Sequence, residues 1–148
     1  MSKFTFSLEA ILRLRESERD EKQEQLAEAI KAEDILRDQI GQIEEEITEL
    51  REQSAAGLRP GTINPDKVLQ SQRFELLLRA QAKQIQEKVK QVQAEVQRRR
   101  DLLVEAERQV KVLEKLREKR QVEFRAKQQK IDRKQIDEIA QRIGQQKS

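Results

Sequence analysis

Gly57-Leu58-Arg59-Pro60-Gly61-Thr62-Ile63-Asn64-Pro65 decides the fold, because this stretch holds both prolines and two of the four glycines in a chain of 148 residues. Gly57 is suited to the left-handed conformation that closes a helix. Asn64 followed by Pro65 is the residue order of an N-cap and a first helical position. The stretch therefore predicts the end of one helix and the start of another.

The outer ends of these helices carry weaker signals. Ser7 can cap the first helix, and Phe6 and Ile11 have the spacing of a hydrophobic staple. Gly144 follows Arg142 and Ile143 and is typical of a helix stop. The predicted elements are one helix over about 7–56, a turn over 57–64 and a second helix over about 65–143, folded as a single coiled-coil hairpin over 1–148.

Composition excludes most chemistry. The chain is 40% charged, 35% hydrophobic and 3% aromatic, and it contains no Cys, His, Trp or Tyr. The usual general base, thiolate nucleophile and transition-metal ligands are therefore missing. We find no P-loop, dinucleotide-binding glycine pattern or catalytic triad, and no stretch near the roughly 18 apolar residues of a membrane span. We predict no enzyme, no cofactor, no metal and no small-molecule substrate.

Apolar residues repeat in steps of three and four along both predicted helices, which is the seam of a left-handed coiled coil. Residues 1–53 contain 8 Lys and Arg against 15 Asp and Glu, and residues 54–148 contain 23 against 13. Opposite net charges favour pairing within one chain, and the short turn makes the helices antiparallel. We predict an all-α, antiparallel two-helix hairpin whose second helix is the longer. The seam positions are Leu26, Ala29, Glu33, Leu36, Ile40, Ile43, Ile47 and Leu50 in the first helix and Leu78, Ala82, Ile85, Val89, Val92, Val96, Arg99, Leu103, Ala106, Val110 and Leu113 in the second.

One part of the seam lacks apolar residues altogether. Residues 15–25 place Arg15, Arg19 and Lys22 at consecutive seam positions. Two interpretations remain open: a loosened seam held by charge pairs, or a weak point where the helices separate or a partner enters. Exposed ion pairs contribute only ~0.2–1 kcal/mol each, so the apolar seam must hold the hairpin together.

The second helix outreaches the first. If Ser7 lies near position 114, residues 115–143 form an overhang with nothing beside it, yet this overhang retains apolar residues. Unpaired apolar positions usually mark an interaction site; the alternatives are fraying or a homodimer. Nucleic acid is disfavoured as a partner, because acidic residues interrupt the basic ones and stacking aromatics are nearly absent. The apolar residues of the overhang are Leu116, Val122, Phe124, Ile131, Ile136, Ile139 and Ile143.

Both ends of the chain carry family-like motifs. The opening Phe4-Thr-Phe6-Ser-Leu8-Glu9-Ala-Ile11-Leu12-Arg13-Leu-Arg15-Glu16 resembles the F-x-F-x-L-E-x-I-L-x-x-R-E start of the flagellar export protein FliJ family. Leu113-Glu-Lys-Leu-Arg-Glu-Lys119 and Lys134-Gln-Ile-Asp-Glu-Ile-Ala140 are similar to its L-E-K-L-K-E-K and K-x-L-D-E-I-A motifs. The resemblance covers essentially the whole chain.

The resemblance implies a cytoplasmic stalk of the bacterial flagellar type III export apparatus, associated peripherally with the inner membrane, and hence a role in motility and chemotaxis. Its implied partners are the hexameric export ATPase, whose assembly and activity it promotes, the cytoplasmic part of the export-gate membrane protein, and export chaperones. The implied ATPase-binding residues are Phe4, Leu8, Leu116, Phe124, Ile131, Ile136, Asp137, Glu138 and Ile139; the implied gate-binding residues are Phe74, Leu78 and Ile85. A free-standing coiled-coil scaffold or chaperone-type protein, including an injectisome stalk, is the alternative.

Overall fold

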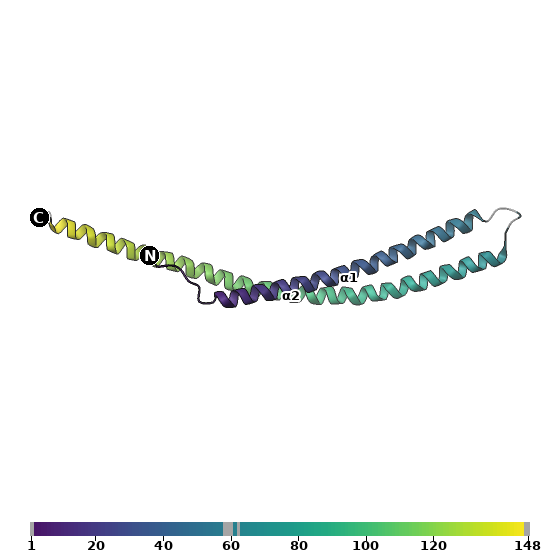
Figure 1. Cartoon of the computed structure of the whole chain (residues 1–148), viewed down its shortest axis with the longest axis horizontal. Helices are drawn as coiled ribbons and strands as arrows, with labels where there is room; N and C mark the ends of the chain where they lie inside the picture. Colours follow the sequence, from purple (N-terminus) through teal and green to yellow (C-terminus); the bar gives the residue numbers. More distant parts are fainter. Residues whose placement is uncertain (1, 58–60, 62, 147–148) are drawn as a thin grey trace. The chain divides into compact units, whose positions relative to one another are not determined.

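A computed structural model of the chain describes residues 2–57, 61 and 63–146. It contains two helices, α1 (Glu9–Ala56) and α2 (Pro65–Gln146), and the described residues include no strand. The helices pack against each other in antiparallel directions, as the sequence predicted (Figure 1). The chain divides into two compact units, unit 1 (Met1–Glu21 with Val104–Ser148) and unit 2 (Lys22–Leu103).

The start of α2 follows the expected capping chemistry. The Asn64 side-chain oxygen accepts a hydrogen bond from the Asp66 backbone N–H at 3.1 Å, and the Asn64 carbonyl accepts the first helical bond from Val68 at 3.2 Å. Asn64 is thus the N-cap and Pro65 the first helical residue, where a missing N–H costs nothing. The predicted cap is confirmed.

Three other helix-end predictions are wrong. Gly57 does not adopt the left-handed conformation: its N–H donates to the Gln53 carbonyl, continuing the helical pattern, and the positive φ of 92° belongs to Gly61. Gly144 does not stop α2, which continues to Gln146. Ser7 lies outside α1, where its hydroxyl accepts a hydrogen bond from Arg120.

The first turn of α1 is organised around Leu8 and Leu12 instead of Ser7. The Leu8 carbonyl accepts the first helical bond from Leu12 at 2.9 Å, and Glu9 N–H donates to the Phe6 carbonyl at 3.1 Å. Leu12 is fully buried, whereas Ile11 is 44% exposed. The apolar contact of Phe6 is therefore with the cluster that contains Leu12, one residue beyond the predicted staple position.

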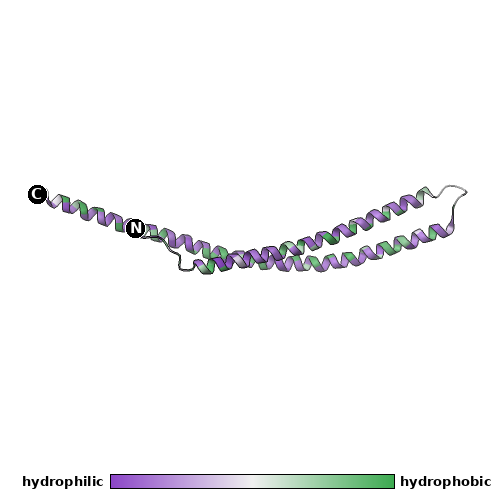
Figure 2. Ribbon diagram, viewed as in Figure 1, coloured by the Kyte–Doolittle hydropathy of each residue, from purple (hydrophilic) through white to green (hydrophobic). Residues whose placement is uncertain are grey.

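The coiled-coil seam is confirmed in both helices. Every predicted seam residue is buried or half-buried, and the exposed positions between them are mostly polar (Figure 2). Burying one such aliphatic side chain contributes about 1.5–3 kcal/mol, so the seam supplies most of the stability. The buried residues are Phe6, Leu12, Ala29, Leu78, Val89, Val96, Ala106 and Val110.

Polar contacts across the helices of unit 2 fix their register. Arg51 Nε bonds Glu75 Oε1 at 2.5 Å near the turn, and this hydrogen bond lowers the pKa of the Glu75 carboxyl. Arg99 occupies a seam position and donates from Nη1 to the backbone carbonyl of Gln25 at 2.5 Å.

Residues 15–25, which lack apolar side chains, contain the boundary between the two units on α1. Arg15, Arg19 and Lys22 are half-buried, as seam positions should be. In this stretch the ion pairs of unit 1 are local: Arg15 pairs with Glu18 at 3.0 Å and Arg19 with Asp20 at 3.3 Å. These two arginines are thus paired within α1 itself.

Candidate partner-binding surfaces

The N-terminal end of unit 1 is an apolar cluster built from both helices and the segment before α1. Phe6, Leu12 and Val110 form its buried centre. Phe4, Leu8, Leu113 and Leu116 pack around it and are half-buried. Three of the residues that the sequence assigned to partner binding, Phe4, Leu8 and Leu116, therefore already contact their own chain.

Residues 2–8, which we call the N-terminal strap, lie along α2 within unit 1 (Figure 1). The Phe4 and Phe124 rings are 5.7 Å apart between centroids, at an interplanar angle of 52°. The Arg120 guanidinium lies 5.6 Å from the Phe6 ring centroid and also donates to Ser7 Oγ at 3.1 Å. Ser2 Oγ donates to Gln128 Oε1 at 3.0 Å.

The strap shortens the predicted overhang. Ser7 contacts Arg120, further along α2 than the expected position 114, and Ser2 reaches Gln128. The physical reason lies within unit 1: residues 2–6 are not helical, and an extended residue advances about 3.3 Å along the chain against about 1.5 Å for a helical one. The strap therefore covers more of α2 than a helix of the same length would. Residues 115–128 were predicted to lie alone; their contacts with the strap correct that expectation.

The uncovered part of α2 is its last segment, residues 129–146, which we call the tail. Every residue of the tail is exposed. Ile136 and Ile139 are 64% and 56% exposed, and with Ile143 they follow the i, i+3, i+7 spacing that places side chains on one helix face. Ile131 is 45% exposed and lies seven residues beyond Phe124, so it extends the stripe that the strap covers.

Asp137 and Glu138, the two acidic residues assigned to ATPase binding, are also exposed on the tail. They lie on the opposite side of the helix from the face formed by Ile136 and Ile139, about 130° from its middle, because successive helical residues are about 100° apart around the axis. The tail therefore presents an apolar stripe on one side and carboxylates on the other.

The residues assigned to gate binding separate into two kinds. Leu78 is 4% exposed and Ile85 is half-buried, so both are seam residues of unit 2. Phe74 is 50% exposed, and Leu77, three residues further on, is exposed beside it. Only Phe74 of the assigned set is thus available to a large partner surface.

Exposed leucines near the turn were missed by the sequence reasoning. Leu69, Leu76 and Leu77 are all about half exposed or more. Leu69 and Leu76 are seven residues apart and so share one face of α2. The sequence did contain a sign of this surface, because these leucines lie outside the heptad seam. An apolar residue at such a position does not pack against the other helix.

The basic sequence Arg98-Arg99-Arg100 is largely engaged by carboxylates of unit 2. Arg98 contacts Glu95 at 2.6 Å and Arg99 contacts it at 2.8 Å. These hydrogen bonds, that of Arg98 first, lower the pKa of the Glu95 carboxyl from 4.5 to about 2. Since their charge is compensated locally, Arg98 and Arg99 provide little free positive potential for phosphate groups.

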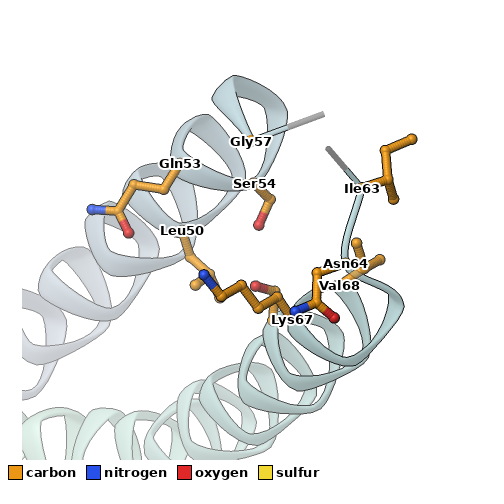
Figure 3. Close-up of a pocket in the computed structure, with 9 residues that line it drawn as sticks. Leu50, Gln53, Ser54, Gly57, Ile63, Asn64, Lys67 and Val68 are labelled. Carbon is orange, nitrogen blue, oxygen red and sulfur yellow. The ribbon is translucent and has the colours of Figure 1, made fainter. Parts of the chain in front are cut away.

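An open hollow of about 380 Å³ lies between the end of α1 and the start of α2 (Figure 3). Leu50, Ser54, Ile63 and Val68 are among its lining residues, and Lys67 is the one titratable group among the described residues that line it. The described residues also contain no group of three or more His, Cys, Asp or Glu that could hold a metal ion. In that same part of the chain, neither helix is apolar over a length sufficient to cross a bilayer.

Two helices paired along a thin apolar seam, with further apolar stripes exposed, are typical of the class of proteins that bind other proteins through helix surfaces. Within that class, the family model described as Flagellar FliJ protein matches residues 4–148. The chain therefore belongs to the FliJ family, whose members are stalk components of the flagellar export apparatus. No match was found among curated proteins or among solved structures.

Proposed function

We propose that this chain is a stalk of the flagellar type III export apparatus that inserts its two-terminus end into the hexameric export ATPase and promotes ring assembly and hydrolysis. Support comes from the family match together with the tail, whose Ile136, Ile139 and Ile143 form an apolar stripe that the described residues leave uncovered. The tail is the observation that carries the proposal, because a helix face this apolar on a mostly polar helix gains stability only from a partner.

The proposed ATPase contacts combine the tail with the apolar cluster of unit 1. Ile131, Ile136 and Ile139 would enter apolar contacts, while Asp137 and Glu138 would pair with basic groups on the ring. The remaining members of this set are Phe4, Leu8, Leu116 and Phe124.

We further propose that the turn-proximal part of α2 contacts the cytoplasmic part of the export-gate membrane protein. Phe74 is the supporting residue, since its half-exposed ring has Leu77 beside it. Leu78 and Ile85 would act indirectly, by holding this part of α2 on the seam. This arrangement would keep the protein in the cytoplasm, peripherally associated with the inner membrane, where export chaperones also reach it.

The ATPase proposal is tested by hydrolysis and ring-assembly measurements with purified export ATPase. Full-length protein should raise both. The double variant Ile136→Asp/Ile139→Asp should lose most of this effect without a change in its melting temperature, since both side chains are already in solvent. Ile35→Asp, at an exposed isoleucine of unit 2, is the matched control and should retain the effect. If wild-type protein changes neither rate nor assembly, the stalk proposal fails.

A free-standing coiled-coil scaffold is the second candidate, favoured by the exposed Leu69, Leu76 and Leu77. Such a protein would self-associate through these leucines and leave the ATPase unaffected. Sedimentation of wild type and of Leu69→Glu/Leu76→Glu separates the two functions: a stalk stays monomeric in both forms, whereas a scaffold dissociates only in the variant.

A further inference from the structure

The residues assigned to ATPase binding do not all face solvent in the free chain. Phe4 and Phe124 contact each other, while Leu8 and Leu116 pack in the cluster centred on Phe6. A partner that uses the α2 side of these contacts therefore competes with a segment of the same chain. Such competition would regulate how strongly the chain binds the ATPase.

The contacts that hold the strap are few. Residues 2–6 are not helical, and the strap gives α1 only the Phe6 and Leu8 carbonyls as backbone acceptors. Burial of the Phe6 ring changes the equilibrium between closed and open strap by about 10- to 150-fold, and an aromatic pair or a cation–π contact at a partly exposed site changes it by about 2- to 10-fold. Opening the strap is still easier than separating the helices, because separation exposes all the aliphatic side chains of the seam.

The α2 surface under the strap has a definite chemistry. Phe124 presents a ring to Phe4, and Arg120, one helical turn earlier, presents a guanidinium to Phe6. The two strap rings are two residues apart, the spacing at which an extended chain places side chains on one side. This surface therefore fits an extended segment with aromatic or apolar side chains at alternate positions.

Exposed Ile131 continues the same stripe beyond the strap. A partner can therefore contact the stripe at Ile131 before the strap moves, and then replace the strap residue by residue towards Arg120. The strap covers only part of a longer binding surface.

We propose that the N-terminal strap is a displaceable cover over the Leu116–Phe124 face of α2, and that an apolar or aromatic segment of the export ATPase must displace it for full binding. The inference rests on the proposed ATPase function. Only the open form binds fully, so in the free chain the strap lowers the apparent affinity for the ATPase by the fraction of molecules in which the strap is open.

A crosslink tests whether the strap must open. Ser2→Cys/Gln128→Cys introduces two thiols, the first in a chain without cysteine, at side chains that are hydrogen-bonded across the strap. Joining them with a short thiol-to-thiol crosslinker should weaken ATPase binding by about tenfold or more relative to the same variant before crosslinking. Equal binding by both forms would overturn the proposal and leave the ATPase function standing.

Weakening the strap should have the opposite effect. Phe6→Leu removes the contact with Arg120 from the strap side, keeps an apolar side chain at this buried position and leaves the α2 surface under the strap unchanged. We expect ATPase binding to tighten by about 2- to 10-fold. Phe74→Leu makes the same exchange at a half-exposed phenylalanine of unit 2 and should leave ATPase affinity unchanged. Unchanged or weaker binding by Phe6→Leu would contradict the cover.

Thiol reactivity in the free chain tests the strap without the ATPase, and so separates this proposal from the proposed ATPase function. Gln121 is half-buried and lines a hollow with Phe4 and Phe6, whereas neighbouring Val122 is exposed. The thiol of Gln121→Cys should react with a maleimide several-fold more slowly than that of Val122→Cys, and adding Arg120→Gln should remove most of the difference. Equal rates without Arg120→Gln would overturn the strap, whatever the ATPase does.

Discussion

Leu12 shows how strongly one position can matter in so thin a core. It is fully buried against Phe6 and Val110, although a chain with two helices offers few positions of this kind. Its neighbour Leu14 is 55% exposed on the same turn of α1. Leu12 and Leu14 have the same helix propensity but differ in burial. Substituting each in turn therefore measures the contribution of burial to stability.

We expect Leu12→Ala to lower the free energy of unfolding by about 2–3 kcal/mol, the lower part of the range for buried leucines, because the open end of unit 1 can collapse around the missing atoms. Leu14→Ala should change it by less than about 0.5 kcal/mol. Urea unfolding followed by circular dichroism measures both. Similar losses for the two variants would contradict the assigned burial.

Glu95 is the residue whose charge state responds most clearly to folding. Hydrogen bonds from Arg98 and Arg99 lower its carboxyl pKa to about 2. Because the folded-state pKa lies below the unfolded one, this interaction stabilises the fold above about pH 4.5 and is lost as the pH falls from there towards 2. The effect is small, since the side chain is partly exposed and solvent screens the charges.

Glu95→Gln should therefore reduce stability modestly at neutral pH and lose less stability than wild type between about pH 4.5 and 2. Melting curves across this range measure the difference. Glu107→Gln, at an exposed position of the same helix, should retain the wild-type pH dependence. A direct check is the carbon-13 titration of the Glu95 carboxyl by NMR, and a midpoint near 4.5 would contradict the hydrogen bonds.

At the scale of the element, α2 begins at a fixed point because Asn64 satisfies an N–H that the helix leaves free. Removing this cap should cost about 1 kcal/mol of stability in Asn64→Ala, whereas Asn64→Ser should retain most of it because serine is also a good cap. Thermal unfolding of the two variants supplies the comparison. If both melt together with wild type, the cap does not contribute to the folded state.

The helices themselves were predictable from the sequence, because a seam repeated over many heptads is a strong signal and the only prolines flank one turn. Register was less predictable. A hairpin with its turn over 57–64 places Ser7 near position 114, but Ser7 contacts Arg120 instead. Local sequence carries no information on how far two helices slide before their side chains interlock.

Part of the candidate partner-binding surface was likewise predictable from the sequence and part was not. The exposure of the tail residues Ile136 and Ile139 could be predicted from sequence, because the shorter first helix cannot reach them. The strap could not, since Phe4 and Phe6 precede α1 and their contacts with Phe124 and Arg120 follow from tertiary packing alone. Leu78 and Ile85 were assigned to a partner by the family resemblance, although their heptad spacing places them in the seam.

For the whole molecule, opposite charges on the two halves of the chain favour pairing of α1 with α2. Cross-helix pairs such as Glu28 with Arg99 in unit 2 and Glu9 with Arg117 in unit 1 express this attraction. We expect a high potassium chloride concentration to lower stability by about 1 kcal/mol or less, because screening weakens exposed pairs but not the apolar seam. Thermal unfolding at low and high salt measures the shift, and a rise in stability would contradict it.

The regular seam of unit 2 also sets a rule for changes in length. Seven residues are two helical turns of a coiled coil, so deleting one heptad from α1 and the facing heptad from α2 returns every remaining seam residue to an equivalent neighbour. Deleting any other number, or a heptad from one helix alone, would rotate or displace one seam against the other. A chain of this kind can therefore be shortened or extended through matched heptads, and its reach can evolve without redesign of its interior.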